Sequence, residues 1–178
     1  MNEEIIIEKM SELEERIKYR FKDINRLATA MNSEKIKISA ESKKHKEYTN
    51  EGLATVGDAL IKLVLADYLY NKPGIKTKGN ITENKKKLES NKVMRKITLK
   101  FLIDYAYNDK HFYSDKDVPE HERVVNKKHD PYVEAVAGAV FYDCGFDKAR
   151  EWITEWLLPH LEKYRDESAA EDNKKKQK

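Results

Sequence analysis

The sequence predicts an all-α protein with a single domain. Its 178 residues are enough to enclose one hydrophobic core. Two nearly continuous apolar segments, residues 51–70 and 131–146, are long enough to form buried helices. Elsewhere apolar residues recur at helical spacing, and no segment alternates apolar and polar residues as a half-buried strand does. No internal repeat divides the chain, so we expect one helical domain.

The N-terminal half is predicted to hold three helices. Residues 3–21 form an amphipathic helix whose apolar face carries Ile5, Ile6, Met10, Leu13 and Ile17. A short helix follows at 23–31, with Ser11 or Asp23 as a candidate cap. The polar, Lys-rich segment 32–50 indicates a loop. The third helix, 51–70, is apolar on most sides and stops before Pro73-Gly74, which cannot extend it.

The C-terminal half continues the helical pattern. Residues 81–107 predict two helices, and the polar segment 108–130 a long connection. The second apolar helix, 131–146, closes at Gly145, and 147–164 form an amphipathic helix with Trp152, Trp156 and Leu157 on one stripe. The charged residues 165–178 are expected to be a disordered tail. We therefore divide the chain into an N-terminal extension (1–11), a helical domain (12–164) and that tail.

Composition narrows the classes of function. Hydrophobic residues make up 39% and charged residues 38%, yet the net charge is only +3. The sequence pI of 8.7 is lower than that of a strongly basic nucleic-acid binder, although local basic patches can still contact phosphate. The single cysteine, Cys144, excludes an internal disulfide and a cysteine-based zinc cluster. With no transmembrane segment and an acidic N-terminus unlike a presequence, we expect a soluble intracellular protein without membrane contact.

Acidic residues mark both apolar helices. Glu51, Ala54 and Asp58 share one face of the first helix, at spacings of three and four residues. On the second helix Glu134 begins the apolar run, four residues after Asp130. Carboxylates that converge from two packed helices can hold magnesium, which takes one or two protein carboxylates and keeps water for a phosphate. The metal can then activate water and neutralise charge on a phosphodiester.

A purely structural interpretation fits the same residues. Asp58 can pair with Lys62 one helical turn later. Asp130-Pro131 has the form of an N-cap followed by proline at the first helical position. Glu51 and Glu134 lie near helix N-termini, where negative charge is favoured in any case. The spacing alone leaves both interpretations open.

Four segments resemble motifs of the ribonuclease III family. NEGLATVGDAL resembles the signature N-E-R-L-E-F-L-G-D-A, with matches at Asn50, Glu51, Leu53, Gly57, Asp58 and Ala59. EAVAGAVFYDCGF, from Glu134 through Phe146, resembles the family's later apolar helix. IKYRFKDINRLATAM is similar to its opening segment, and in KKLESNKVMRKI the pair Ser90-Asn91 matches a third helix. The resemblance covers about residues 12–160 in the family's order.

The resemblance implies a function and a site. Members have an all-helical, dimeric endonuclease domain that cuts double-stranded RNA with magnesium, for which manganese can substitute. It implies that Asp58 and Glu134 are metal ligands and catalytic, that Glu51 is the outer catalytic Glu, and that Asp130 is a displaced ligand. Two positions depart from the family. The central Glu of the signature falls at Ala54, and the Asp three residues before the final Glu falls at Pro131.

These departures leave two hypotheses of function. The first is a magnesium-dependent endonuclease of double-stranded RNA. The second is a catalytically silent subunit that binds RNA or pairs with another ribonuclease III-like chain in a ribonucleoprotein. Either would dimerise, as a homodimer or heterodimer, through the region of residues 51–70. The residues predicted to contact RNA are Lys85, Lys86, Asn91, Lys127 and Lys128.

Overall fold

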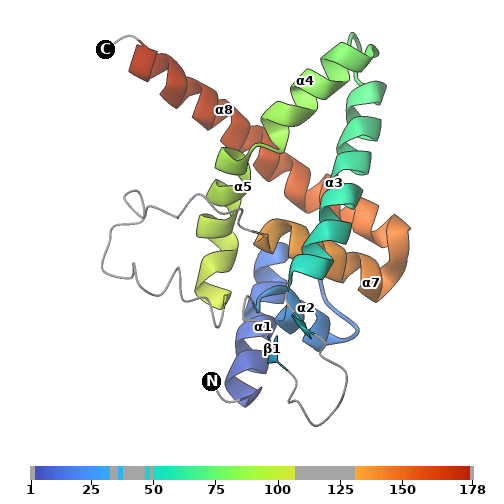
Figure 1. Cartoon of the computed structure of the whole chain (residues 1–178), viewed down its shortest axis with the longest axis vertical. Coiled ribbons are helices and arrows are strands. Elements are labelled where there is room, and N and C mark those ends of the chain that lie inside the picture. Colours follow the sequence, from blue (N-terminus) through green and yellow to red (C-terminus); the bar gives the residue numbers. More distant parts are fainter. Residues whose placement is uncertain (1–2, 33–35, 38–46, 49, 107–130, 177–178) are drawn as a thin grey trace.

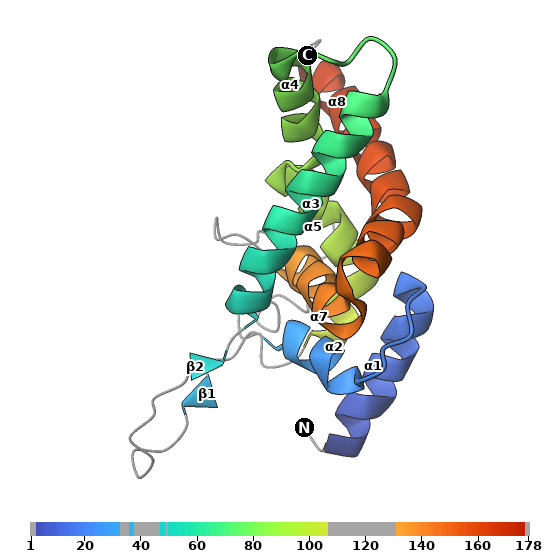
Figure 2. The same cartoon turned by 90° about the vertical axis from the view of Figure 1, so that its right-hand side faces the viewer.

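The computed structural model describes residues 3–32, 36–37, 47–48, 50–106 and 131–176. Nearly all of these residues are helical, which confirms the predicted all-α class. The N-terminal helices lie at one end of the molecule and the C-terminus at the other (Figures 1 and 2). None of the helices in these ranges is long and apolar enough to cross a membrane.

Two long helices form the centre of the fold. α3 (Glu51–Asn71) and α7 (Tyr132–Trp152) lie against each other over much of their length. They approach closely because each has a glycine at the contact. A β-carbon on Gly57 would overlap the carbonyl oxygen of Glu134, and one on Gly138 would overlap that of Leu53. The two apolar segments that predicted buried helices are therefore neighbours, in backbone contact at these glycines.

The N-terminal helices pack beneath this pair. α1 (Glu3–Ile17) contacts α2 (Ile24–Ala30), and α2 packs on α7. Asp23 caps α2, since its side chain accepts a hydrogen bond from the Asn25 backbone N–H at 3.1 Å. The C-terminus of α1 is held by two indole N–H groups: Trp152 donates to the Ile17 carbonyl at 2.9 Å and Trp156 to the Arg16 carbonyl at 3.1 Å. These bonds satisfy carbonyls that the helix itself leaves without a partner.

The remaining helices cover the far end of α3. α4 (Lys78–Leu88) returns antiparallel to it, and α5 (Asn91–Ile97) continues into the π-helical turn η1 (Thr98–Leu102) and the 3₁₀ turn η2 (Ile103–Tyr105). After α7, the π-helical turn η3 (Ile153–Leu157) leads into α8 (Leu158–Lys176). α8 packs on α5 and α4, as both views show.

The structure corrects the expected limits of the domain. Residues 165–176 are helical rather than disordered, because α8 continues along α5 and forms ion pairs with it. Lys96 Nζ lies 2.6 Å from Glu171 Oε1, and Lys92 Nζ lies 2.9 Å from Asp172 Oδ1. At the other end, α1 passes through residue 11 without a break and buries Met10 completely, so no boundary separates residues 3–11 from the domain.

Two backbone features lie outside the simple helical pattern. A two-residue antiparallel ladder joins β1 (Ile36–Lys37) to β2 (Glu47–Tyr48), within a segment expected to be loop. In α7 the helix breaks at Gly145, whose φ of 79° and ψ of −176° are accessible to glycine at little cost. The sequence correctly predicted a helix end there, but a second helical stretch resumes at once.

Candidate carboxylate site

Asp58 lies on α3 and forms an ion pair with Lys62 of the same helix. Lys62 Nζ donates to Asp58 Oδ2 at 2.7 Å, one helical turn along. The Asp58 side chain is 43% exposed, although the helix that carries it was predicted to be buried. α3 is apolar on most sides, but the face that carries Asp58 and Lys62 remains open to solvent. The pair with Lys62 that the spacing allows is present in the structure.

Glu134 is the buried acid of the site. It lies in the first turn of α7 and is 3% exposed. Its backbone carbonyl touches Gly57, the residue before Asp58, at the closest approach of α3 and α7. The helix crossing therefore brings the segments of Asp58 and Glu134 together, as the sequence predicted. Negative charge at this helix N-terminus is favourable, which helps to support an acid in a buried place.

The electrostatics of the site converge on Lys62. Its hydrogen bond to Asp58 raises the pKa of Lys62 above the ordinary value, although partial burial opposes the increase. The negative charges of Asp58, Glu89 and Glu134 add to it. Three carboxylates from three different helical regions thus act on one ammonium group.

Glu89 is the member of this group that the sequence analysis missed. It follows the last residue of α4, and its side chain is only 18% exposed. Its Oε1 forms an ion pair with Lys85 Nζ at 3.4 Å. Its Oε2 is buried and has no hydrogen-bond partner among the described residues. The only feature of the sequence that could have indicated Glu89 is its position directly before Ser90-Asn91, the pair that matches the family.

The other predicted ligand positions do not complete a metal site. Ala54 is buried at 9% exposure and has only a methyl group there, which cannot bind an ion or its water. Glu51 is exposed in the first turn of α3. Pro131 takes the cap position of α7, and Asp130 lies outside the described residues. Within the described ranges no three His, Cys, Asp or Glu side chains are close enough to hold a metal ion. The residues described here do not fit a magnesium site as they stand.

The predicted RNA-contacting residues gather at one junction where they are described. Lys85 and Lys86 lie in the last turn of α4, and Asn91 begins α5 after the capping residue Ser90. Lys86 and Asn91 are exposed, whereas Lys85 is directed to Glu89. Lys127 and Lys128 lie outside the described residues. Exposed Lys76, Lys78 and Lys87 add positive charge along α4 and the turn before it.

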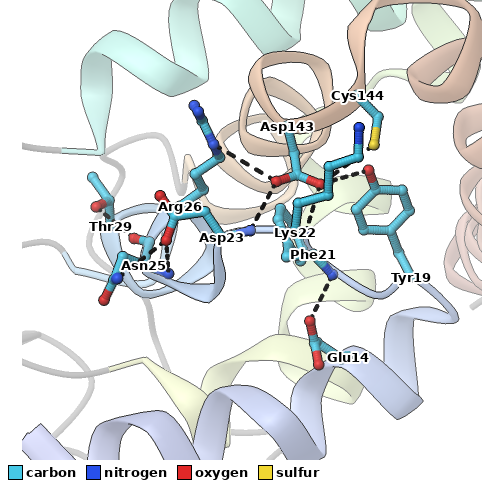
Figure 3. A network of polar contacts seen from close by, with 10 residues as sticks. All are labelled: Glu14, Tyr19, Phe21, Lys22, Asp23, Asn25, Arg26, Thr29, Asp143 and Cys144. Atoms are coloured by element: carbon cyan, nitrogen blue, oxygen red, sulfur yellow. Dashed lines mark hydrogen bonds and ion pairs between the residues drawn. The ribbon is translucent and has the colours of Figure 1, made fainter.

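A second polar centre, built on Asp143 of α7, is structural (Figure 3). Its carboxylate is 1% exposed and accepts hydrogen bonds from the Tyr19 hydroxyl and the Lys22 backbone N–H, each at 3.0 Å, and from the Asp23 N–H at 3.2 Å. Arg26 Nε lies 3.6 Å away. Asp143 therefore fastens the link between α1 and α2 to α7. The signature residue Asn50 has a similar role, since its amide donates to the Ala30 carbonyl at 3.2 Å and ties α2 to α3.

The all-α fold built around the α3–α7 crossing belongs to a class of helical domain with solved members. The fold is similar to two crystal structures of the nuclease domain of ribonuclease III from Campylobacter jejuni. One of these concerns structural flexibility in a region involved in dimer formation. Their TM-scores are 0.66 and 0.64, and each is 25% identical to this chain in sequence. The matched regions cover 87% and 86% of this chain, and 97% and 93% of the two nuclease-domain chains. A family model described as Ribonuclease-III-like matches residues 38–161. The chain belongs to the ribonuclease-III-like family.

Full-length relatives show how much of the family protein this chain represents. Ribonuclease 3 of Fusobacterium nucleatum is 30% identical over 160 residues, which are 87% of this chain and 62% of that protein. Ribonuclease 3 of Bdellovibrio bacteriovorus is 25% identical, over 83% of this chain and 60% of that protein. The chain therefore spans about three fifths of these relatives.

Proposed function

We propose that this protein is a dimeric, RNA-binding member of its family that acts in double-stranded RNA processing without cutting the RNA itself. One observation carries the proposal. At the position where a metal-binding acid is needed, Asp58 is already bound to Lys62, and Ala54 offers no ligand beside it. An ion that requires near-octahedral oxygen ligands is poorly served by this set.

Duplex binding is supported by the surface around the α4–α5 junction. Lys86 and Lys87 are exposed at the end of α4, next to Asn91 in sequence, and Lys76 and Lys78 are exposed before and at its start. Scattered lysines contact phosphates without reading sequence, and A-form RNA is recognised mainly by its shape, its phosphates and its 2′-hydroxyls. The expected ligand is therefore an RNA duplex of unspecified sequence, bound more weakly as salt rises.

Dimer formation is supported by a partly exposed apolar stripe on α3. Val56, Ala59, Leu63, Ala66 and Tyr70 follow spacings of three and four residues along one side of the helix. Leu63 is 55% and Tyr70 54% exposed. Large apolar side chains aligned on a surface mark interaction sites. A second ribonuclease III-like chain, identical or different, is the partner we propose for this stripe.

A second candidate is magnesium-dependent cleavage of the duplex. It is favoured by Glu134, which is retained and buried, and by the convergence of the Asp58 and Glu134 charges on Lys62. Burying an acid is costly, so its retention is compatible with a role in chemistry. In this alternative, Asp58, Glu134 and Asp130 would bind magnesium or manganese, assisted by Glu51, after Lys62 had moved away from Asp58.

One experiment separates these functions. Labelled RNA duplex is incubated with the protein, with Asp58→Asn and with Ala54→Glu, in magnesium or manganese, and binding and cleavage are followed on gels. We expect both the wild type and Asp58→Asn to shift the duplex and to leave it uncut. Cleavage that Asp58→Asn abolishes would establish the enzyme instead. If no duplex is shifted even at low salt, the protein has no direct role with RNA. A gain of cleavage in Ala54→Glu would place residue 54 beside the metal.

A further inference from the structure

We propose that the acidic stretch of α8, residues 167–172, is a reversible cover that keeps two lysines of α5 away from RNA phosphates. The inference deepens the proposed function and rests on its assignment of duplex binding to the α4–α5 junction. Lys92 follows Asn91, the predicted RNA contact that begins α5, and Lys96 lies one helical turn further along. The two lysines therefore continue the positive charge of that junction along α5.

Ion pairs between the two helices hold the cover in place. Lys92 Nζ lies 2.9 Å from Asp172 Oδ1 and 3.1 Å from Glu171 Oε2. Lys96 Nζ lies 2.6 Å from Glu171 Oε1 and 3.8 Å from Glu167 Oε2. Each lysine thus faces two carboxylates of α8, and a phosphate must replace these carboxylates before it can pair with either lysine.

Few other contacts hold this end of α8 on α5. Among the α8 side chains that the structure describes, which end at residue 174, Ser168 is the last buried one. Its backbone carbonyl accepts a hydrogen bond from Lys92 at 3.3 Å, but its buried hydroxyl has no partner among the described residues, which disfavours the covered arrangement. Exposed ion pairs contribute little to stability and weaken as salt rises. The cover is therefore held mainly by charges for which a polyanion can compete.

The charge of the stretch suits a competitor of RNA. From Arg165 to Asp172 the chain has four acidic residues and one basic residue. Their carboxylates have the sign of a phosphate, so they occupy the lysines and also repel an approaching duplex. Residues 174–176 are lysines, which confines the acidic stretch to the turns that meet α5. A duplex offers Lys92 and Lys96 equivalent anionic partners, and the release of its counterions favours the exchange.

The test compares a neutralised cover with a charge-matched control, each of which lacks three carboxylates. The cover variant carries Glu167→Gln, Glu171→Gln and Asp172→Asn. The control carries changes at three exposed positions of α1, at the opposite end of the molecule: Glu4→Gln, Glu8→Gln and Glu12→Gln. Affinity for a labelled RNA duplex is measured by fluorescence anisotropy without metal, at several salt concentrations.

We expect the cover variant to bind about tenfold more tightly than the wild type at low salt, and to lose affinity with salt more steeply, by about two phosphate contacts. The control should stay within about twofold of the wild type, because distant exposed charges are largely screened. Adding Lys92→Gln and Lys96→Gln to the cover variant should remove the gain. In the wild type, duplex binding should speed amide hydrogen exchange in residues 169–174, since the end of α8 is released.

The inference is overturned if the cover variant and the control bind alike, if the gain survives the loss of both lysines, or if the duplex leaves exchange in residues 169–174 unchanged. Duplex binding by the wild type would still support the proposed function in each of these cases. If neither the wild type nor the cover variant binds the duplex at low salt, the proposed function and this inference both fail.

Discussion

Buried carboxylates in this fold divide into acids that accept hydrogen bonds from the backbone of another segment and an acid at the crossing of α3 and α7. Asp143 belongs to the first kind, since backbone N–H groups and a hydroxyl converge on it. Burial raises the pKa of Asp143, but the bonds from the Lys22 and Asp23 N–H groups and from Tyr19 outweigh it, so the pKa lies below its ordinary value. Glu134 belongs to the second kind, next to a solvent-facing ion pair.

Replacing Asp143 with Asn should therefore destabilise the fold and change its response to acid. We expect a loss of about 2–4 kcal/mol in the free energy of unfolding at neutral pH, measured by urea denaturation. A lowered carboxyl pKa gives stability that is present above the unfolded pKa and lost as pH falls through the folded one. The wild type should thus lose stability more steeply than Asp143→Asn below about pH 4.

The control for this prediction is Asp104→Asn. Asp104 is 72% exposed and lies 3.7 Å from Arg16, so its removal should change stability little. If Asp143→Asn were as stable as Asp104→Asn, the Asp143 network would not be what joins the link between α1 and α2 to α7.

Among the elements, the α3–α7 crossing decides where the site residues lie. Its close approach depends on the missing side chains at Gly57 and Gly138. A contact between backbones cannot yield as a flexible side chain would, so adding a methyl group there must push the helices apart. Such a shift would also move Asp58 relative to Glu134.

Gly57→Ala should therefore cost more than about 3 kcal/mol in unfolding free energy, or prevent folding, despite the higher helix propensity of alanine. The matched control is Gly52→Ala on the same helix, where an added β-carbon meets nothing within 4 Å. That variant should be neutral or gain up to about 1 kcal/mol. Circular-dichroism melts of both test this, and equal melting temperatures would rule out the close crossing.

At the scale of the whole molecule, the domain is asymmetric in what it leaves exposed. The α4–α5 junction carries exposed lysines, while the α3 stripe presents Leu63 and Tyr70. One surface suits phosphate and the other suits an apolar partner. A dimer formed through the stripe would give an RNA duplex two copies of the basic surface, which increases affinity without new contacts in either copy.

Leu63→Lys should convert a dimer into a monomer by placing a charge in the middle of the stripe. Sedimentation velocity measures the change, and Ile5→Lys on α1 is the control, because Ile5 is also exposed, at 46%. Duplex affinity should fall along with dimerisation in Leu63→Lys alone. A wild-type protein that remains monomeric at high concentration would mean that the stripe is not a homodimer interface.

Local sequence determined the identity and order of the helices. The spacing of apolar residues is a property of the nearest turns, which is why helices over 51–70 and 131–146, the break at Gly145 and the cap at Asp23 were all predictable. The prediction that the charged tail is disordered was wrong for the same reason, because it considered local sequence alone. Its helix is held by Lys92 and Lys96, which bond to residues 75 and 80 positions away, and local composition does not record such partners.

Tertiary structure alone decided how the site is arranged. Sequence placed Asp58 and Glu134 on two buried helices, but the rotation of each helix about its axis is fixed by the contact at Gly57 and Gly138. That rotation leaves Asp58 half exposed and buries Glu134. Periodicity fixes which residues share a face, whereas close packing between distant segments fixes what that face meets.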